Sequence, residues 1–88
     1  MPAISVFYGI TVYMYRELGG KHHRPHIHAR FGEYEVVVAF DGEILEGKLP
    51  IGKQKLLEAW IEIHFDDLNS TWQLLQSGEK TFRISPLR

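Results

Sequence analysis

The sequence predicts an α+β protein: an antiparallel β-meander of about four strands with one long C-terminal helix packed on one face and a short final edge strand. Two observations carry this prediction. Residues 10–48 contain short runs of alternating apolar and polar side chains separated by glycine-containing turns, which is typical of hairpins. Residues 52–77 instead repeat apolar side chains at helical spacing. One amphipathic helix covering one face of an antiparallel sheet is a stable layered arrangement.

Composition limits the class of protein further. The 88 residues predict a single domain, residues 1–88, because the chain is too short for two ordinary domains. Hydrophobic residues make up 44% and charged residues 24%, as in soluble globular proteins, which argues against a disordered chain. The net charge of −1 provides no overall basic field that would attract nucleic acid.

Cysteine usage and hydropathy bear on the cellular compartment. The chain has no cysteine, which excludes disulfide bonds and thiolate metal sites and fits a reducing cytosol. It contains no apolar run of membrane-spanning length and no signal-like N-terminus. We therefore expect a cytoplasmic protein without a membrane partner.

The first strand is predicted at residues 10–16, where every second side chain is aliphatic. Residues 4–8 either extend this strand or form a separate short one. Residues 17–25, which contain two glycines and a proline, predict a loop.

Two hairpins follow. Residues 26–31 and 34–40 alternate on either side of Gly32-Glu33, a dipeptide that favours a two-residue type II′ turn. Asp41-Gly42 favours a type I′ turn into a third arm at residues 43–48. Because two-residue turns fix the register, the sequence predicts these pairs: Phe31 with Tyr34, Arg30 with Glu35, Ala29 with Val36, His28 with Val37, Ile27 with Val38, His26 with Ala39, Glu46 with Val37 and Ile44 with Ala39.

This register separates an inner face, which meets the helix, from an outer face that turns away from it. The inner face is apolar because the alternation places Ile27, Ala29 and Val36 there. If the first strand pairs antiparallel to the second, the outer face also gains two tyrosines. It then consists of Tyr13, Tyr15, His26, His28, Arg30, Glu35, Val37, Ala39, Ile44 and Glu46.

The helix is predicted to begin at Gly52 and to stop at Gly78, with a kink allowed at residues 66–70. Its apolar stripe includes His64, which we expect to be buried against the sheet and hydrogen-bonded to Asp67. Residues 80–85 alternate again and predict the final edge strand.

Four of the five histidines lie at residues 22–28, which raises the possibility of a metal site. His26 and His28 occupy alternate positions of a strand, about 7 Å apart, a span that one ion can bridge. A histidine of the preceding loop and Glu46 are the further candidate ligands. No closed set of four ligands is evident, so we expect no bound metal and no cofactor.

Acid–base catalysis and RNA binding are two further alternatives. Imidazole titrates near neutrality, so His26 or His28 can serve as acid or base in a metal-independent ribonuclease. Tyrosines beside Arg30 on an open sheet can also stack unpaired bases, although the basic residues are too few to follow a phosphate backbone. The sequence leaves enzymatic activity open and assigns no catalytic residue.

A protein-binding face is the alternative that we favour. Val37, Ala39 and Ile44 would make the outer face too apolar to remain in water, which predicts a small protein partner or a homodimer. The predicted binding residues are Tyr13, Tyr15, His26, His28, Arg30 and Glu46.

Four segments together closely resemble a known family: MPAISVFYGITVYMY, RPHIHARFGEYEVVV, ILEGKLP and AWIEIHFDDL. The family is small, bacterial and catalogued as domain of unknown function 4160, and the likeness spans nearly the whole chain. Members usually carry two prolines before the first motif histidine, whereas Arg24 replaces the first of them here. The residues that match the family signature are Pro25, His26, His28, Ala29, Gly32, Tyr34, Glu46, Gly47, Trp60 and His64.

The resemblance implies no established activity. Members often lie beside another small uncharacterised protein in an arrangement that looks like a toxin–antitoxin pair. This implies a protein-interaction module that is one half of such a pair, with an RNA-binding protein or ribonuclease as the alternative.

Overall fold

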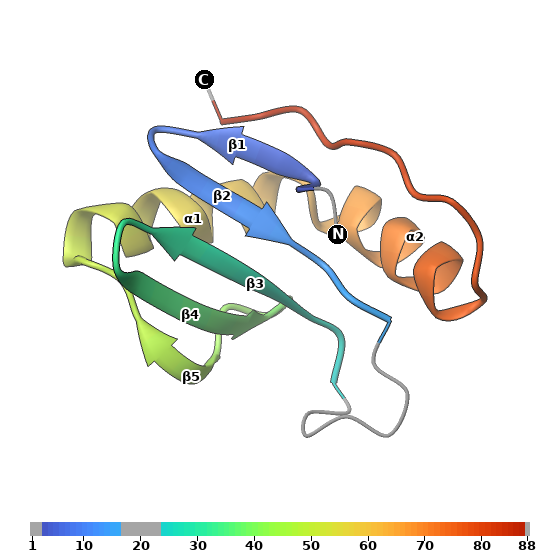
Figure 1. Ribbon diagram of the computed structural model, residues 1–88, viewed down its shortest axis with the longest axis horizontal. Helices are drawn as coiled ribbons and strands as arrows, with labels where there is room; N and C mark the ends of the chain where they lie inside the picture. The colour runs from blue at the N-terminus through green and yellow to red at the C-terminus, as the bar shows by residue number, and fades with distance from the viewer. Residues whose placement is uncertain (1–2, 17–23, 88) are drawn as a thin grey trace.

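The computed structural model describes residues 3–16 and 24–87. Within them, five strands precede two helices, and the strands form one antiparallel sheet in chain order. Both helices lie against the same face of this sheet (Figure 1). The elements are β1 (Ser5–Phe7), β2 (Ile10–Tyr13), β3 (His26–Phe31), β4 (Tyr34–Ala39), β5 (Ile44–Lys48), α1 (Ile51–Ile63) and α2 (Phe65–Gln76).

The antiparallel meander is confirmed, and the N-terminal residues form a separate strand rather than an extension of β2. Tyr8 and Gly9 connect β1 to β2 with φ angles of 49° and 80°. Two positive φ angles in a two-residue connection give the twist that a tight hairpin needs. A tyrosine at such an angle is unusual, which is why the sequence left this turn undecided.

The β3–β4 hairpin has the predicted register at all six pairs, from Phe31 opposite Tyr34 to His26 opposite Ala39. Gly32 has a φ of 58°, as the first residue of a type II′ turn requires. Strand β2 pairs antiparallel to β3, with Tyr13 opposite His28. Alternation and one short turn were therefore enough to fix the centre of the sheet.

The predicted type I′ turn between β4 and β5 is wrong. Only Gly42 has a positive φ there, and the Ala39 amide donates to the Glu43 carbonyl, which makes a three-residue loop. Glu46 lies opposite Val37 as predicted, but a register shift places Ile44 opposite Val38 instead of Ala39. The extra loop residue places Ile44 opposite Val38, and the unpaired Leu45 then restores the predicted register at Glu46.

The single long helix is also wrong, because the chain forms two helices that meet at His64. His64 has φ and ψ of −107° and 24°, outside the α-helical range, so the break lies before the kink allowed at residues 66–70. Asp66 and Asp67 occupy the first turn of α2. Acidic side chains there stabilise a new helix N-terminus, which favours a restart at this point.

The predicted final edge strand at residues 80–85 is absent from the described structure. The C-terminal segment, residues 79–87, instead runs without regular structure along β1 (Figure 1). The Ile84 amide donates to the Ile4 carbonyl at 2.7 Å, and the Trp60 indole donates to the Ser85 carbonyl at 2.8 Å. One backbone bond holds the segment beside the sheet but does not make a ladder.

The hydrophobic core lies between the inner face of the sheet and the two helices. Trp60 is fully buried at its centre, with its ring 5.2 Å from that of Phe7. Burying a large apolar side chain contributes about 1.5–3 kcal/mol, so this layer dominates the stability of the fold. No helix in the described part of the chain is long and apolar enough to cross a membrane.

Candidate functional site

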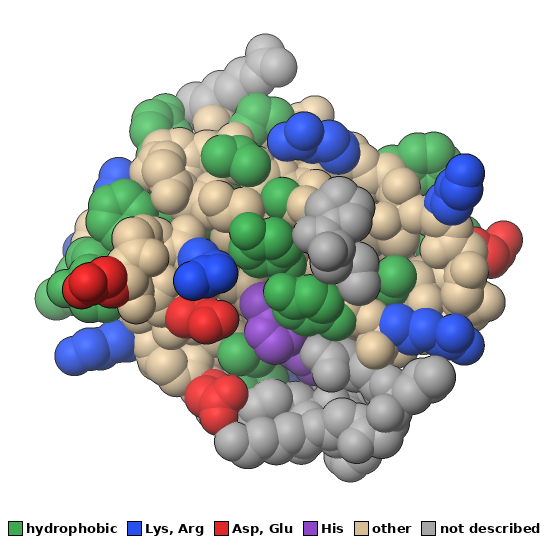
Figure 2. Space-filling model, viewed as in Figure 1, with side chains coloured by type: hydrophobic (Ala, Val, Ile, Leu, Met, Phe, Trp, Pro, Cys, Tyr) green, Lys and Arg blue, Asp and Glu red, His purple; other side chains and the backbone are tan. Residues whose placement is uncertain are grey.

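The outer face of the sheet carries most of the predicted binding residues, and neither described helix lies across it. Val37 and Ala39, expected to make this face too apolar for water, are buried, whereas Ile44 is 45% exposed. A row of side chains crosses it from Tyr13 on β2 through His28 and Val37 to Glu46 on β5, because these residues are cross-strand partners. Figure 2 views this face and shows histidine beside hydrophobic and acidic side chains. Antiparallel alternation therefore brings together four residues that are far apart in sequence.

Aromatic rings form a connected cluster on this face. Tyr13 and Tyr15 are stacked, with centroids 6.2 Å apart, and the edge of the His28 ring meets Tyr15 at 4.7 Å. All three side chains are only partly buried. Offset and edge-to-face contacts of this kind hold aromatic rings in defined orientations. The cluster is a fixed, partly exposed aromatic surface.

His26 differs from the prediction, which placed it on the exposed outer face. Its ring is only 1% exposed, and it lies 5.2 Å from the ring of His28 and 5.3 Å from that of Trp72 of α2. Its Nδ1 lies 2.6 Å from the Arg24 carbonyl oxygen, so Nδ1 carries the proton and donates it. His26 thus supports the site from beneath and is not presented to a ligand.

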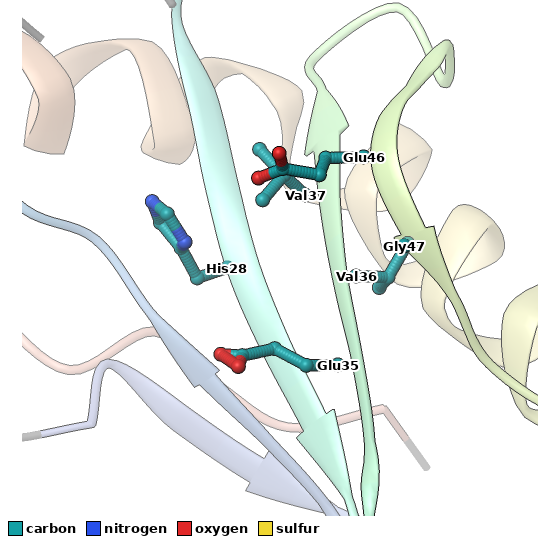
Figure 3. Close-up of a pocket in the computed structure, with 6 residues that line it drawn as sticks. All are labelled: His28, Glu35, Val36, Val37, Glu46 and Gly47. Atoms are coloured by element: carbon teal, nitrogen blue, oxygen red, sulfur yellow. The ribbon is translucent and has the colours of Figure 1, made fainter. Parts of the chain in front are cut away.

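A shallow cavity of about 310 Å³ opens beside His28. Figure 3 shows the carboxylates of Glu35 and Glu46 on the same side of the sheet as the His28 ring, with Val37 between the strands. The site prediction left out Glu35 and Gly47, which also line the cavity. The alternation of β4 places Glu35 on the outer face, so its signal was present in the sequence.

Arg30 lies opposite Glu35, but no ion pair joins these two described side chains. Lys48 is the cross-strand neighbour of Glu35 on its other side. All three side chains are exposed. This end of the outer face therefore alternates in charge, whereas the end with Tyr15 and His26 is aromatic.

Gly47 shapes the wall of the cavity. It has a φ of 75°, and a Cβ added there would overlap the Glu35 carbonyl oxygen. Only glycine combines a left-handed backbone with so close an approach to the neighbouring strand. The position of Glu46 over the cavity consequently depends on the residue that follows it.

Arg24 anchors the start of β3 to the β4–β5 loop through ion pairs with Asp41 and Glu43. The Glu43 amide donates to the Asp41 carboxylate at 3.0 Å, and this bond, together with Arg24, holds the pKa of Asp41 below its usual value. The carboxylate of Glu43 in turn raises the pKa of Arg24. The two ion pairs tie the residue before Pro25 to the loop that follows β4.

No group of three or more histidine or acidic side chains among residues 3–16 and 24–87 is arranged to hold a metal ion. His22 and His23, the loop histidines considered as ligands, lie outside the described residues. The expectation of no bound metal stays a prediction.

His64 lies apart from the outer-face histidines, at the junction of the two helices. Its ring contacts Trp60 at 5.5 Å, and its Nδ1 lies 3.5 Å from the Asp67 carboxylate. Its side chain is 16% exposed, so the expected partner is present and the burial is incomplete. The surroundings of His64 favour a structural role.

The resemblance to a known family, inferred above from sequence segments, is supported by a family model. A family described as Domain of unknown function (DUF4160) matches residues 9–73, from the β1–β2 turn into α2. The chain belongs to this family. No curated protein and no solved structure matches it. The matched residues therefore include the outer-face strands β2 to β5 and the cavity, but not the C-terminal segment along β1.

Proposed function

We propose that this member of the DUF4160 family is a protein-interaction module that binds a small protein partner through its outer sheet face. The observation that carries the proposal is the connected, partly exposed cluster of Tyr13, Tyr15 and His28 on the face opposite the two described helices. Tyrosines are enriched in protein interfaces because they bury a large area and keep a polar tip.

The charges beside this cluster support a protein partner over RNA. Glu35 and Glu46 line the cavity, and two carboxylates repel the phosphates of a nucleic-acid backbone. Arg30 and Lys48, two basic side chains of this face, both lie across the strands from the acidic Glu35. A protein surface with mixed polar and apolar groups suits this pattern better.

A metal-independent ribonuclease is the second candidate, and one observation favours it. An imidazole and two carboxylates, from His28, Glu35 and Glu46, line the same cavity, and such groups can donate and accept protons during phosphodiester cleavage. His26 has no such role in this candidate because it is buried beneath Trp72.

The partner to test first is the protein encoded by the adjacent gene, as in a toxin–antitoxin-like pair. The two proteins are co-expressed with a streptavidin-binding tag on this chain, because its own histidines would interfere with a nickel column. We expect co-purification that His28→Ala and Tyr13→Ala reduce at least tenfold. Phe82→Ser is the matched control, since Phe82 is 75% exposed beside β1, at the edge of the sheet opposite β5.

Incubation with bulk RNA separates the two candidates. An interaction module leaves the RNA intact in wild type and in His28→Ala. A ribonuclease instead yields products that disappear in His28→Ala. Co-purification that both outer-face variants leave unchanged would refute the proposed surface.

A further inference from the structure

The two edges of the sheet differ in what covers them. The C-terminal segment runs along β1 and bonds to Ile4, as described above. Among the described residues, β4 is the only element that forms a backbone ladder with β5. Strand β5 is also the most exposed strand of the sheet. An edge with unpaired backbone groups is a template for a further strand.

The charges of β5 select which strand can pair with it. Glu46 and Lys48 are outer-face residues on either side of Gly47. If a second β5 pairs antiparallel about a twofold axis at Gly47, Glu46 of each copy lies opposite Lys48 of the other. A register centred on Glu46 would instead place two carboxylates opposite each other, which is unfavourable.

Two exposed isoleucines favour the same register. Ile44 is 45% exposed at the start of β5, and Ile51 is 77% exposed just after its end. Ile44 lies three positions before Gly47, and Pro50 lies three positions after it. Pairing about Gly47 therefore brings Ile44 of one copy beside Pro50 and Ile51 of the other, at both ends of the shared seam.

The irregular shape of β5 makes this pairing selective. The left-handed backbone at Gly47 and the register shift near Leu45 distort the edge, which protects it from an arbitrary strand. Under the twofold register the two Gly47 residues lie opposite each other, so the left-handed positions of the two copies coincide at the axis, while Leu45 of each copy lies opposite Leu49 of the other.

We propose that the protein forms a homodimer in which β5 pairs antiparallel with β5 of a second copy, with Gly47 at the twofold axis. The two five-stranded sheets then form one continuous sheet. Because the axis is perpendicular to the sheet, both outer faces lie on the same side. Glu46 and Gly47 border both the cavity and the seam, so the two cavities flank the dimer interface.

Sedimentation velocity on the full chain tests this dimer. We expect wild type to dimerise with a dissociation constant on the order of tens of micromolar, as suits a small interface. Glu46→Lys or Lys48→Glu alone should weaken dimerisation about tenfold or more, because each substitution creates two like-charge pairs. The double variant Glu46→Lys/Lys48→Glu should restore the wild-type constant to within about threefold.

A pair of isoleucine variants on α1 tests the apolar part of the seam. Ile51→Asp should weaken the dimer, whereas Ile63→Asp, at a position 64% exposed at the other end of α1, should not. Circular dichroism confirms that each variant is folded. A wild type that remains monomeric at millimolar concentration, a double variant as weak as the single ones, or equal effects of the two aspartates would each overturn the proposal.

Discussion

The two faces of the sheet are formed by the same strands, but the inner face packs into the core and the outer face carries the candidate site. On β3, Ile27 and Ala29 point inward and are fully buried, while His28 between them points outward beside Tyr13 and Tyr15. Adjacent residues of one strand thus belong to the core and to the candidate site in turn. Because neighbouring residues face opposite sides, one substitution should lower stability while a substitution at the next position should weaken binding. The following predictions test this separation.

The largest effect is expected for the inner face. Trp60→Ala should lower the free energy of unfolding by about 3–5 kcal/mol, because it removes the most deeply buried ring and the indole bond to Ser85. Urea denaturation followed by circular dichroism measures this loss. A decrease in the free energy of unfolding of less than about 1 kcal/mol would contradict the conclusion that the inner face supplies most of the stability.

Gly47→Ala should affect both faces at once. The left-handed backbone alone costs about 1–3 kcal/mol for a residue with a Cβ, and overlap with the Glu35 carbonyl adds to it. NMR spectra should show changed amide chemical shifts in both β4 and β5, and thermal denaturation should show a lower midpoint. Gly52→Ala is the matched control, since a Cβ at Gly52 meets nothing within 4 Å and alanine favours the helix.

A pair of histidine variants sharpens the comparison most directly. His64→Ala should destabilise the fold by about 1–3 kcal/mol through lost contacts with Trp60 and Asp67, while the folded protein keeps its binding. His28→Ala should weaken binding at least tenfold and change stability by less than about 1 kcal/mol. The reverse outcome, a stable His64→Ala variant without binding, would place His64 in the functional site.

The smallest effect is expected at the end of the sheet, which belongs to neither face. The pKa of Asp41 is lowered in the folded protein, so its ionised form contributes stability at neutral pH. This contribution is lost as pH falls through that lowered pKa. Asp41→Asn should therefore be slightly less stable than wild type at pH 7 and equal to it in acid. A difference in thermal midpoint that grows toward acid would contradict this sign.

The centre of the fold could be predicted from sequence because it depends on local patterns. Period-two alternation and a glycine-first turn fixed every β3–β4 pair, and the same alternation placed Tyr13 and His28 on one face. Such features need only neighbours along the chain. The family likeness rested on these same segments and is confirmed over residues 9–73.

The remaining features depend on contacts between distant parts of the chain. Trp72 of α2 packs against the buried His26, and the course of α2 depends on the helix break at His64, where the apolar spacing continues without interruption. The course of the C-terminal segment likewise depends on Ile4 and Trp60. A sequence pattern predicts which face is apolar but not which distant ring will cover a given side chain.

The bond between Ile84 and Ile4 has a consequence for the order of folding. Consecutive hairpins form between near neighbours and close quickly, whereas this contact joins opposite ends of the described chain and must wait for a long loop to close. We expect the C-terminal segment to dock last and to detach first. Amide hydrogen exchange at Ile84 should then be faster than in β3 and β4, and limited proteolysis should begin in this segment while the sheet remains intact.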